Sequence, residues 1–341
     1  MKKIITIIVA AAIVLAAGIF AIIHFSAPEK EQTPQSDRPD LLVSMTDQKL
    51  MTSYYKNNKV LHKEKMTDYP ASALDRKHNI LYYTNTDESG VKRLIKLELK
   101  TGKKTTLYSG KEYVDELSLS KDGSKLFMRY NQPEERNFHL ASFDLKTKSF
   151  TVIYPKLSDK DETVSFYQYD QNSGKSVLLH YSESEDYKKT DEANSKGIDP
   201  EPTNMRISLA DEKHEKEIKT IAKFINDIAI SPDGKTIVFT STDAEGEKTA
   251  IYELDLETKK YQSIIADGRD FTLIDSAEPQ FSKDGKTIYF LAEAKGAKIL
   301  KDDAGNEANV RTIFAYDRDT KKVSKEWEQS NGIINGFTVL N

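Results

Sequence analysis

Three segments of this 341-residue chain repeat one pattern: LSLSKDGSKLFM at 117–128, IAISPDGKTIVFT at 228–240 and PQFSKDGKTIYFL at 279–291. Each segment alternates apolar and polar residues, turns at a Ser-x-Asp-Gly and continues as a second apolar strand. A unit of this kind, recurring about every fifty residues, cannot bury its apolar face alone. The repeat therefore predicts a ring or a stack of similar small sheets.

The clearest copy, residues 225–266, reads as four strands joined by three short connections, which is the size of one propeller blade. Further copies begin near residues 71, 116, 166 and 278. The copy near 166 is degenerate and carries a polar insertion at 183–204, and the copy near 278 carries a second insertion at 295–309. Residues 211–225 have the composition of an amphipathic helix, but their place in the repeat favours an outer strand.

The two ends of the chain supply a sixth blade. Residues 41–66 contain three strand-like runs without an inner strand, and the last ten residues, GIINGFTVLN, form a single inner-strand-like run. Joining them would leave no wide unpaired sheet edge. The sequence therefore predicts an all-β fold, a six-bladed β-propeller over residues 41–341, closed by N-terminal strands plus a C-terminal strand.

The N-terminus predicts a membrane segment. Lys2 and Lys3 precede an uncharged run from Ile4 to Ile23, whose twenty residues would span about 30 Å as a helix. We expect residues 1–25 to be a signal anchor, one N-terminal transmembrane helix, and residues 26–40 to be a Pro-rich charged linker. The two lysines favour a cytoplasmic N-terminus, which places the propeller outside the cytoplasm on the cell membrane. Cleavage of a signal peptide and secretion is the alternative.

Composition argues against several kinds of chemistry. The chain has no cysteine, so disulfides and thiolate catalysis are absent. The net charge is −4, with basic and acidic residues interspersed, so no basic footprint for nucleic acid is visible. The six histidines are far apart without metal-ligand spacing, and the Gly-x-Ser-x-Gly nucleophile motif is missing. We therefore expect no catalytic residue, no bound metal and no cofactor.

Three carboxylates share one register of the repeat. Glu116, Asp227 and Glu278 each stand four residues before the turn serine, where an inner strand begins. Convergence near one mouth of the central channel would create an acidic funnel for a cation or a basic peptide segment. The other copies have Ala71 and Phe166 at this place. Simple polar residues at strand starts are the alternative interpretation.

The pattern at 231–239, followed by Ile-Tyr-x-Leu-Asp-Leu-x-Thr-x-Lys at 251–260, resembles the propeller repeat of TolB-type periplasmic proteins. It is similar also to the propeller domain of prolyl oligopeptidase-like enzymes. The resemblance covers most of residues 70–325 and implies the fold, but little about function. We expect neither the separate N-terminal α/β domain of TolB nor a hydrolase domain, so neither a Tol–Pal role nor peptidase activity carries over.

Together these features predict a membrane-anchored, non-catalytic binding scaffold for a protein, a peptide or a cell-envelope polymer, without nucleic-acid partners. The alternative is a metal-dependent hydrolase or lyase with its site at the mouth of the central channel.

Overall fold

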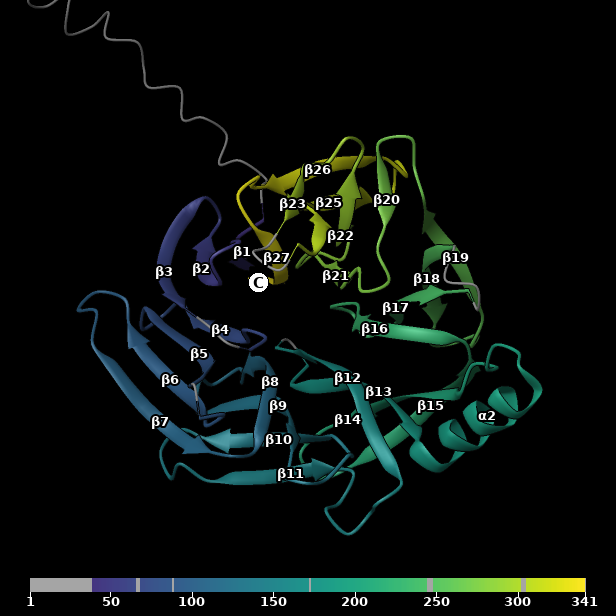
Figure 1. Cartoon of the computed structure of the whole chain (residues 1–341), viewed down its shortest axis with the longest axis horizontal. Coiled ribbons are helices and arrows are strands. Elements are labelled where there is room, and N and C mark those ends of the chain that lie inside the picture. Colours follow the sequence, from purple (N-terminus) through teal and green to yellow (C-terminus); the bar gives the residue numbers. More distant parts are fainter. Residues whose placement is uncertain are drawn as a thin grey trace, which may run out of the picture. The chain divides into compact units, whose positions relative to one another are not determined.

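The computed structural model describes residues 39–65, 68–87, 89–171, 173–243, 248–301 and 305–340. Within Asp40–Asn341, which is one compact unit, six antiparallel sheets follow one another around a ring (Figure 1). The predicted six-bladed propeller is therefore confirmed. The expected membrane segment, residues 1–25, lies outside the described residues, and no helix among the described ones is long and apolar enough to span a bilayer.

Each of the first three blades has four strands, which follow one another from the channel outwards. Blade 1 consists of β27 (Ile333–Val339), β1 (Leu41–Thr46), β2 (Met51–Lys56) and β3 (Lys59–Lys65). Blade 2 consists of β4 (Ser72–Asp75), β5 (Ile80–Thr86), β6 (Lys92–Glu98) and β7 (Lys104–Gly110). Blade 3 consists of β8 (Tyr113–Leu119), β9 (Lys125–Asn131), β10 (His139–Asp144) and β11 (Phe150–Tyr154).

The remaining blades carry the irregularities. Blade 4 consists of β12 (Glu162–Asp170), β13 (Lys175–Ser182), β14 (Asn204–Ala210) and β15 (Glu215–Ala222). Blade 5 consists of β16 (Phe224–Ile230), β17 (Thr236–Thr242), β18 (Thr249–Asp255) and β19 (Tyr261–Ala266). Blade 6 consists of β22 (Thr287–Ala294), β25 (Arg311–Asp317) and β26 (Val323–Glu328), with an inner strand divided into β20 (Phe271–Leu273) and β21 (Gln280–Phe281).

Strands from both ends of the chain close the ring as predicted. In blade 1, β27 pairs with β1 along its length, from Leu41 opposite Val339 to Thr46 opposite Ile333. The segment 211–225 contains the outer strand β15, so the strand interpretation is confirmed over the helical one. Its exposed, charged residues suit an outermost strand, because that strand lies at the rim of its blade, furthest from the channel.

The core lies between blades. One buried cluster joins Ala229 and Val238 of blade 5 to Phe290 and Phe314 of blade 6, whose rings stack with centroids 5.8 Å apart. The middle strands are buried over consecutive residues, because successive side chains point to opposite faces of a blade and both faces pack against a neighbour. In β17, Ile237 packs toward blade 4 and Val238 packs toward blade 6. Stacked sheets of this kind bury the apolar face that a lone blade would expose.

The Ser-x-Asp-Gly turns are structural. In blade 5, Ser231 Oγ donates to Asp233 Oδ1 (2.6 Å) and accepts from the Thr236 amide (2.9 Å). Gly234 adopts φ of 70°, a left-handed conformation that side chains disfavour. The turn serines and aspartates of blades 3 and 6 are bonded in the same way. These aspartates therefore shape turns and do not mark a binding site.

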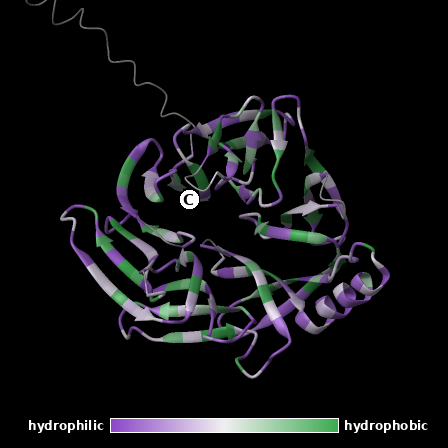
Figure 2. Cartoon of the chain, viewed as in Figure 1, coloured by the Kyte–Doolittle hydropathy of each residue, from purple (hydrophilic) through white to green (hydrophobic). Residues whose placement is uncertain are grey.

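Both insertions contain regular secondary structure. Most of the polar insertion at 183–204 forms helix α2 (Glu183–Lys196), which projects from blade 4 and is largely hydrophilic (Figures 1 and 2). Within 295–309, a small hairpin pairs β23 (Ile299–Lys301) with β24 (Glu307–Asn309).

Candidate functional site

A cavity of about 150 Å³ lies at the centre of the ring. All six innermost strands contribute residues to its wall: Leu74, Leu119, Tyr167, Ile230, Phe281 and Val339. A second cavity of about 50 Å³ lies at the end where the inner strands begin, beside Tyr69, Pro70 and Gly336. The two cavities together follow the axis of the propeller.

Glutamine side chains tie neighbouring inner strands together around this cavity. Gln168 accepts from the Ile230 amide (3.0 Å), which joins blade 4 to blade 5. Gln280 donates to the Phe337 carbonyl (2.6 Å) and accepts from the Val339 amide (3.0 Å), which joins blade 6 to blade 1. The channel wall is therefore held by hydrogen bonds as well as by packing, and it is preorganised for a ligand.

Glu116 and Glu278, two of the three carboxylates singled out in the sequence, line both cavities. Both residues have a left-handed backbone, with φ of 51° and 48°. Glu116 lies in a bulge of β8, and Glu278 precedes β21 in the break of its inner strand. A bulge redirects a side chain, and strained backbone of this kind is concentrated at functional sites.

The carboxyl groups of Glu116 and Glu278 resist ionisation. Burial, together with the charges of Asp115 and Asp227, raises the pKa of Glu116 to about 7. Burial and the charges of Glu116 and Asp227 raise the pKa of Glu278 well above its usual range. Both side chains keep some accessible surface, but that surface faces the narrow channel, where surrounding protein limits solvent screening.

Asp227 has a different place from the other two. Its side chain is 1% exposed, and its carboxylate accepts hydrogen bonds from the amides of Thr240 (3.0 Å) and Glu278 (2.8 Å). Burial raises the pKa of Asp227 to about 6, although these bonds act in the opposite direction. Asp227 therefore fixes the backbone of Glu278 from the neighbouring blade, and it does not line either cavity.

Nearby residues that the sequence did not single out complete the site. Arg129 donates to both oxygens of Asp115 (2.9 and 2.7 Å) and to the Ser165 carbonyl (2.7 Å), so its charge is already engaged. Tyr69, which lines the smaller cavity, donates to the Asn335 carbonyl (2.5 Å). A Cβ on Gly336 would lie 3.1 Å from Glu278 Oε2, so glycine leaves room for this carboxylate. Repeat comparison could not identify Arg129, because the repeats share no residue type at its position: Thr240 stands there in blade 5.

The chemistry available at this site is acceptance of hydrogen bonds and of positive charge. Among the described residues, no group of three or more His, Asp or Glu side chains is arranged to hold a metal ion. A pair of carboxyl groups with raised pKa values can share protons, or it can ionise fully when a cation enters.

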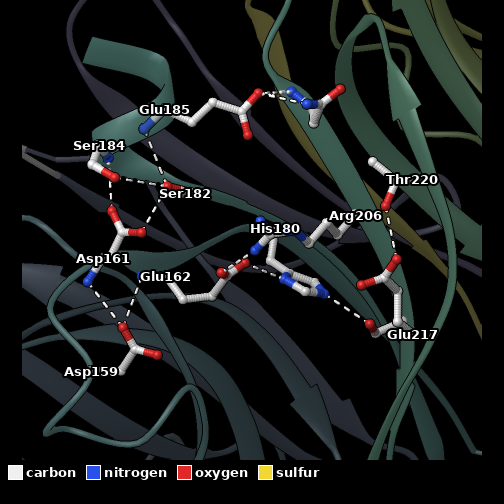
Figure 3. Close-up of polar contacts among 12 residues, drawn as sticks. Asp159, Asp161, Glu162, His180, Ser182, Ser184, Glu185, Arg206, Glu217 and Thr220 are labelled. Atoms are coloured by element: carbon white, nitrogen blue, oxygen red, sulfur yellow. Dashed lines mark hydrogen bonds and ion pairs between the residues drawn. The ribbon is translucent and has the colours of Figure 1, made fainter. Parts of the chain in front are cut away.

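A second polar cluster lies in blade 4, beside α2 (Figure 3). His180 contacts Glu162 through Nδ1 (2.5 Å) and Ser208 through Nε2 (2.8 Å), and Arg206 also binds Glu162. The order Ser, His, Glu matches that of a nucleophilic triad. Ser208 is fully buried, however, so no substrate could reach its hydroxyl. The cluster therefore satisfies buried polar groups within the sheet.

The ring of blades, the central cavity and the repeat define the class of six-bladed β-propellers, which is the fold that the resemblance to TolB-type proteins implied. TolB from Acinetobacter baumannii has a similar structure, with a TM-score of 0.58 and 14% identity, covering 87% of this chain. The chain spans 65% of the length of that TolB. An oligogalacturonate lyase in complex with manganese has a TM-score of 0.52 and 12% identity, over 78% of this chain and 73% of the lyase. At these identities the likeness shows the fold alone.

Within this class, the chain is 50% identical over 304 residues to the uncharacterized protein YdjN of Bacillus subtilis, covering 89% of this chain and 87% of YdjN. The chain belongs to the YdjN family. It matches no protein-family model.

Proposed function

We propose that this protein is a membrane-anchored, extracytoplasmic binding scaffold without catalytic activity, which takes a basic group of a protein, peptide or envelope component into its channel. The observation that carries the proposal is the pair Glu116 and Glu278, which faces the same cavities from two blades and has raised pKa values. Asp227 supports this pair through the backbone of Glu278.

The charge of a ligand follows from this chemistry. A carboxyl pair that resists ionisation gains most from a cation, because a positive charge removes both the mutual repulsion and part of the desolvation cost. An ammonium group has three N–H donors and no acceptor, which suits two carboxylates. A cavity of about 150 Å³ has room for about five waters, since each occupies about 30 Å³ in the liquid. It would therefore admit one side chain rather than a folded segment.

A binding assay with the full chain tests the proposal. We expect a fluorescent tetralysine peptide to bind more tightly than tetraglutamate at pH 7, and we expect the double change Glu116→Gln and Glu278→Gln to weaken binding at least about tenfold. Glu257→Gln, at an exposed turn of blade 5, is the matched control. Equal binding of tetralysine to the wild type and the double variant would show that the channel carboxylates do not bind the basic group.

Two further measurements test the membrane anchor and the side of the membrane on which the propeller lies. Resistance of the full chain to carbonate extraction from membranes tests the anchor formed by residues 1–25, and labelling of whole cells tests its orientation.

The alternative, a metal-dependent hydrolase or lyase, predicts stoichiometric metal in the purified protein and turnover of a polymer or peptide. Bound metal or turnover would each favour the enzyme over the binding scaffold.

A further inference from the structure

Charge is distributed unevenly around the ring. Residues 40–110, which with the uncharged β27 form blades 1 and 2, contain 13 Lys and Arg against 8 Asp and Glu, a net charge of +5. Residues 161–270, which form blades 4 and 5, contain 14 Lys and Arg against 24 Asp and Glu, a net charge of −10. In a ring of six, blades 4 and 5 lie opposite blades 1 and 2 (Figure 1). The near-neutral total therefore conceals a strong charge asymmetry.

The chain enters the propeller at these basic blades, 1 and 2. Asp40, directly before β1, contacts Lys56 Nζ (3.2 Å), Asn57 Nδ2 (3.1 Å) and Arg76 (3.4 Å). Asn57 belongs to the turn between β2 and β3, and Arg76 to the turn between β4 and β5. The Leu99 amide donates to the Asn79 carbonyl (2.9 Å), which brings the turn between β6 and β7 to the same end. Three turns of blades 1 and 2 thus surround the first residue of the propeller.

Four lysines of these turns, Lys59, Lys77, Lys100 and Lys103, form what we call the lysine cluster. All four are exposed, and none has an ion-pair partner among the described residues.

The acidic groups beside the lysine cluster are already engaged. Asp40 is paired with Lys56 and Arg76, Asp75 contacts His78 (2.6 Å), and Glu98 is paired with Lys96 (3.8 Å). The cluster therefore presents positive charge that the protein itself does not neutralise.

We propose that the lysine cluster binds an anionic lipid surface and thereby orients the propeller on the membrane. This inference rests on the anchor in the proposed function: residues 26–40 would separate the expected membrane span from β1, and fifteen residues reach at most about 50 Å. The cluster surrounds the end of that tether, so it is held within reach of the headgroups. Each lysine near such a surface strengthens the attraction about fivefold. The acidic blades 4 and 5 are repelled, which turns α2 away from the bilayer.

The single tryptophan provides a reporter at the right place. Trp327 Nε1 donates to the Asn57 carbonyl (2.8 Å), in the turn directly before Lys59. We suggest reconstituting the full chain in vesicles of phosphatidylcholine, with or without phosphatidylglycerol, and measuring energy transfer from Trp327 to a dansyl group on the lipid headgroups. The expected result is greater transfer in the anionic vesicles, and loss of the difference at high salt, because salt screens exposed charges.

Matched variants separate the lysine cluster from total charge. Changing Lys59, Lys77, Lys100 and Lys103 to Glu should abolish the dependence on phosphatidylglycerol. Changing Lys213, Lys235, Lys259 and Lys260 to Glu, at exposed positions in turns of blades 4 and 5, alters the net charge equally and should leave it intact. Circular dichroism checks that both variants fold.

Other outcomes overturn the proposal. Equal transfer in neutral and anionic vesicles would do so, as would retention of the full effect in the fourfold variant. If the fourfold variant instead loses affinity only for an isolated anionic wall polymer, the partner of the cluster is that polymer and not lipid. Failure of the anchor is seen separately, because the chain would then not sediment with neutral vesicles.

Discussion

At the scale of single residues, Glu116 and Glu278 differ from surface acids because the protein surrounds them and places them near other carboxylates. Their left-handed backbone turns both side chains toward the channel, whereas Asp227, in the same repeat register, accepts two amide bonds inside the wall. The sequence register therefore predicted which positions matter. It could not predict which side chains face the cavity, because that direction depends on a local bulge and on the backbone φ.

This chemistry predicts how stability depends on pH. Glu116 has a pKa of about 7 in the folded protein against 4.5 as its ordinary value, so the folded state holds its proton more tightly than the unfolded chain. Stability from this group is fully present below about pH 4.5, and it is lost as the pH rises through 7. Glu278 acts in the same direction.

We expect Glu116→Gln with Glu278→Gln to raise the free energy of unfolding at pH 8 by about 1–2 kcal/mol, and to change it little at pH 4.5. Urea unfolding at the two pH values measures this. The control Glu257→Gln should show no such difference. A double variant that is less stable than the wild type at pH 8 would contradict the account of the pair.

At the scale of elements, helix α2 could be predicted from the sequence only in part. Ser182 caps the helix by accepting from the Glu185 amide, and Gly197 ends it with φ of 64°. A Ser-x-x-Glu spacing is typical of a helix start, and a glycine is typical of a helix end. The sequence therefore contained the signals for this helix, although 183–204 was predicted only as a polar insertion. The carboxylate that holds the start of the helix, Asp161, could not be predicted in this way, because it comes from the connection before β12. It accepts from the Ser182 hydroxyl (2.7 Å) and the Ser184 amide (2.8 Å) (Figure 3).

Asp161→Ala should therefore loosen α2 selectively. We expect a loss of about 1–2 kcal/mol in unfolding free energy, since the buried Ser182 hydroxyl and the Ser184 amide lose their acceptor. Amide exchange should accelerate in residues 183–196 and stay unchanged in blades 1 and 2. Asp191→Ala, on an exposed face of the same helix, is the control. Uniform acceleration across the propeller would show that Asp161 stabilises the fold rather than the helix.

At the scale of the whole molecule, the number of blades and the closure of the ring followed from sequence, because the repeat and its incomplete ends recur in phase. The charge asymmetry was hidden by the interspersed charges, and it appears only when residues are grouped by blade. The central cavity likewise needs all six inner strands in place, so no single segment of sequence encodes it.

Ring closure predicts the effect of truncation. Removing residues 332–341 withdraws β27, including the buried Ile334 and Phe337, and exposes the edge of β1. We expect the unfolding free energy to fall by at least about 4 kcal/mol, and dimers or larger species to form through the free edge. Calorimetry and size-exclusion chromatography measure both effects. Deleting residues 298–309, the hairpin of blade 6, should leave the ring closed and the protein monodisperse.

The central claim is that the carboxyl groups of Glu116 and Glu278 receive a cation in the channel. The measurement that tests it most directly is calorimetry of tetralysine binding to the full chain at pH 7, in buffers of different ionisation enthalpy. Because a cation favours ionisation of Glu116 and Glu278, binding should release protons, on the order of one per site, and the release should vanish in the double Gln variant. Binding without proton release, or release that persists in that variant, would contradict the account.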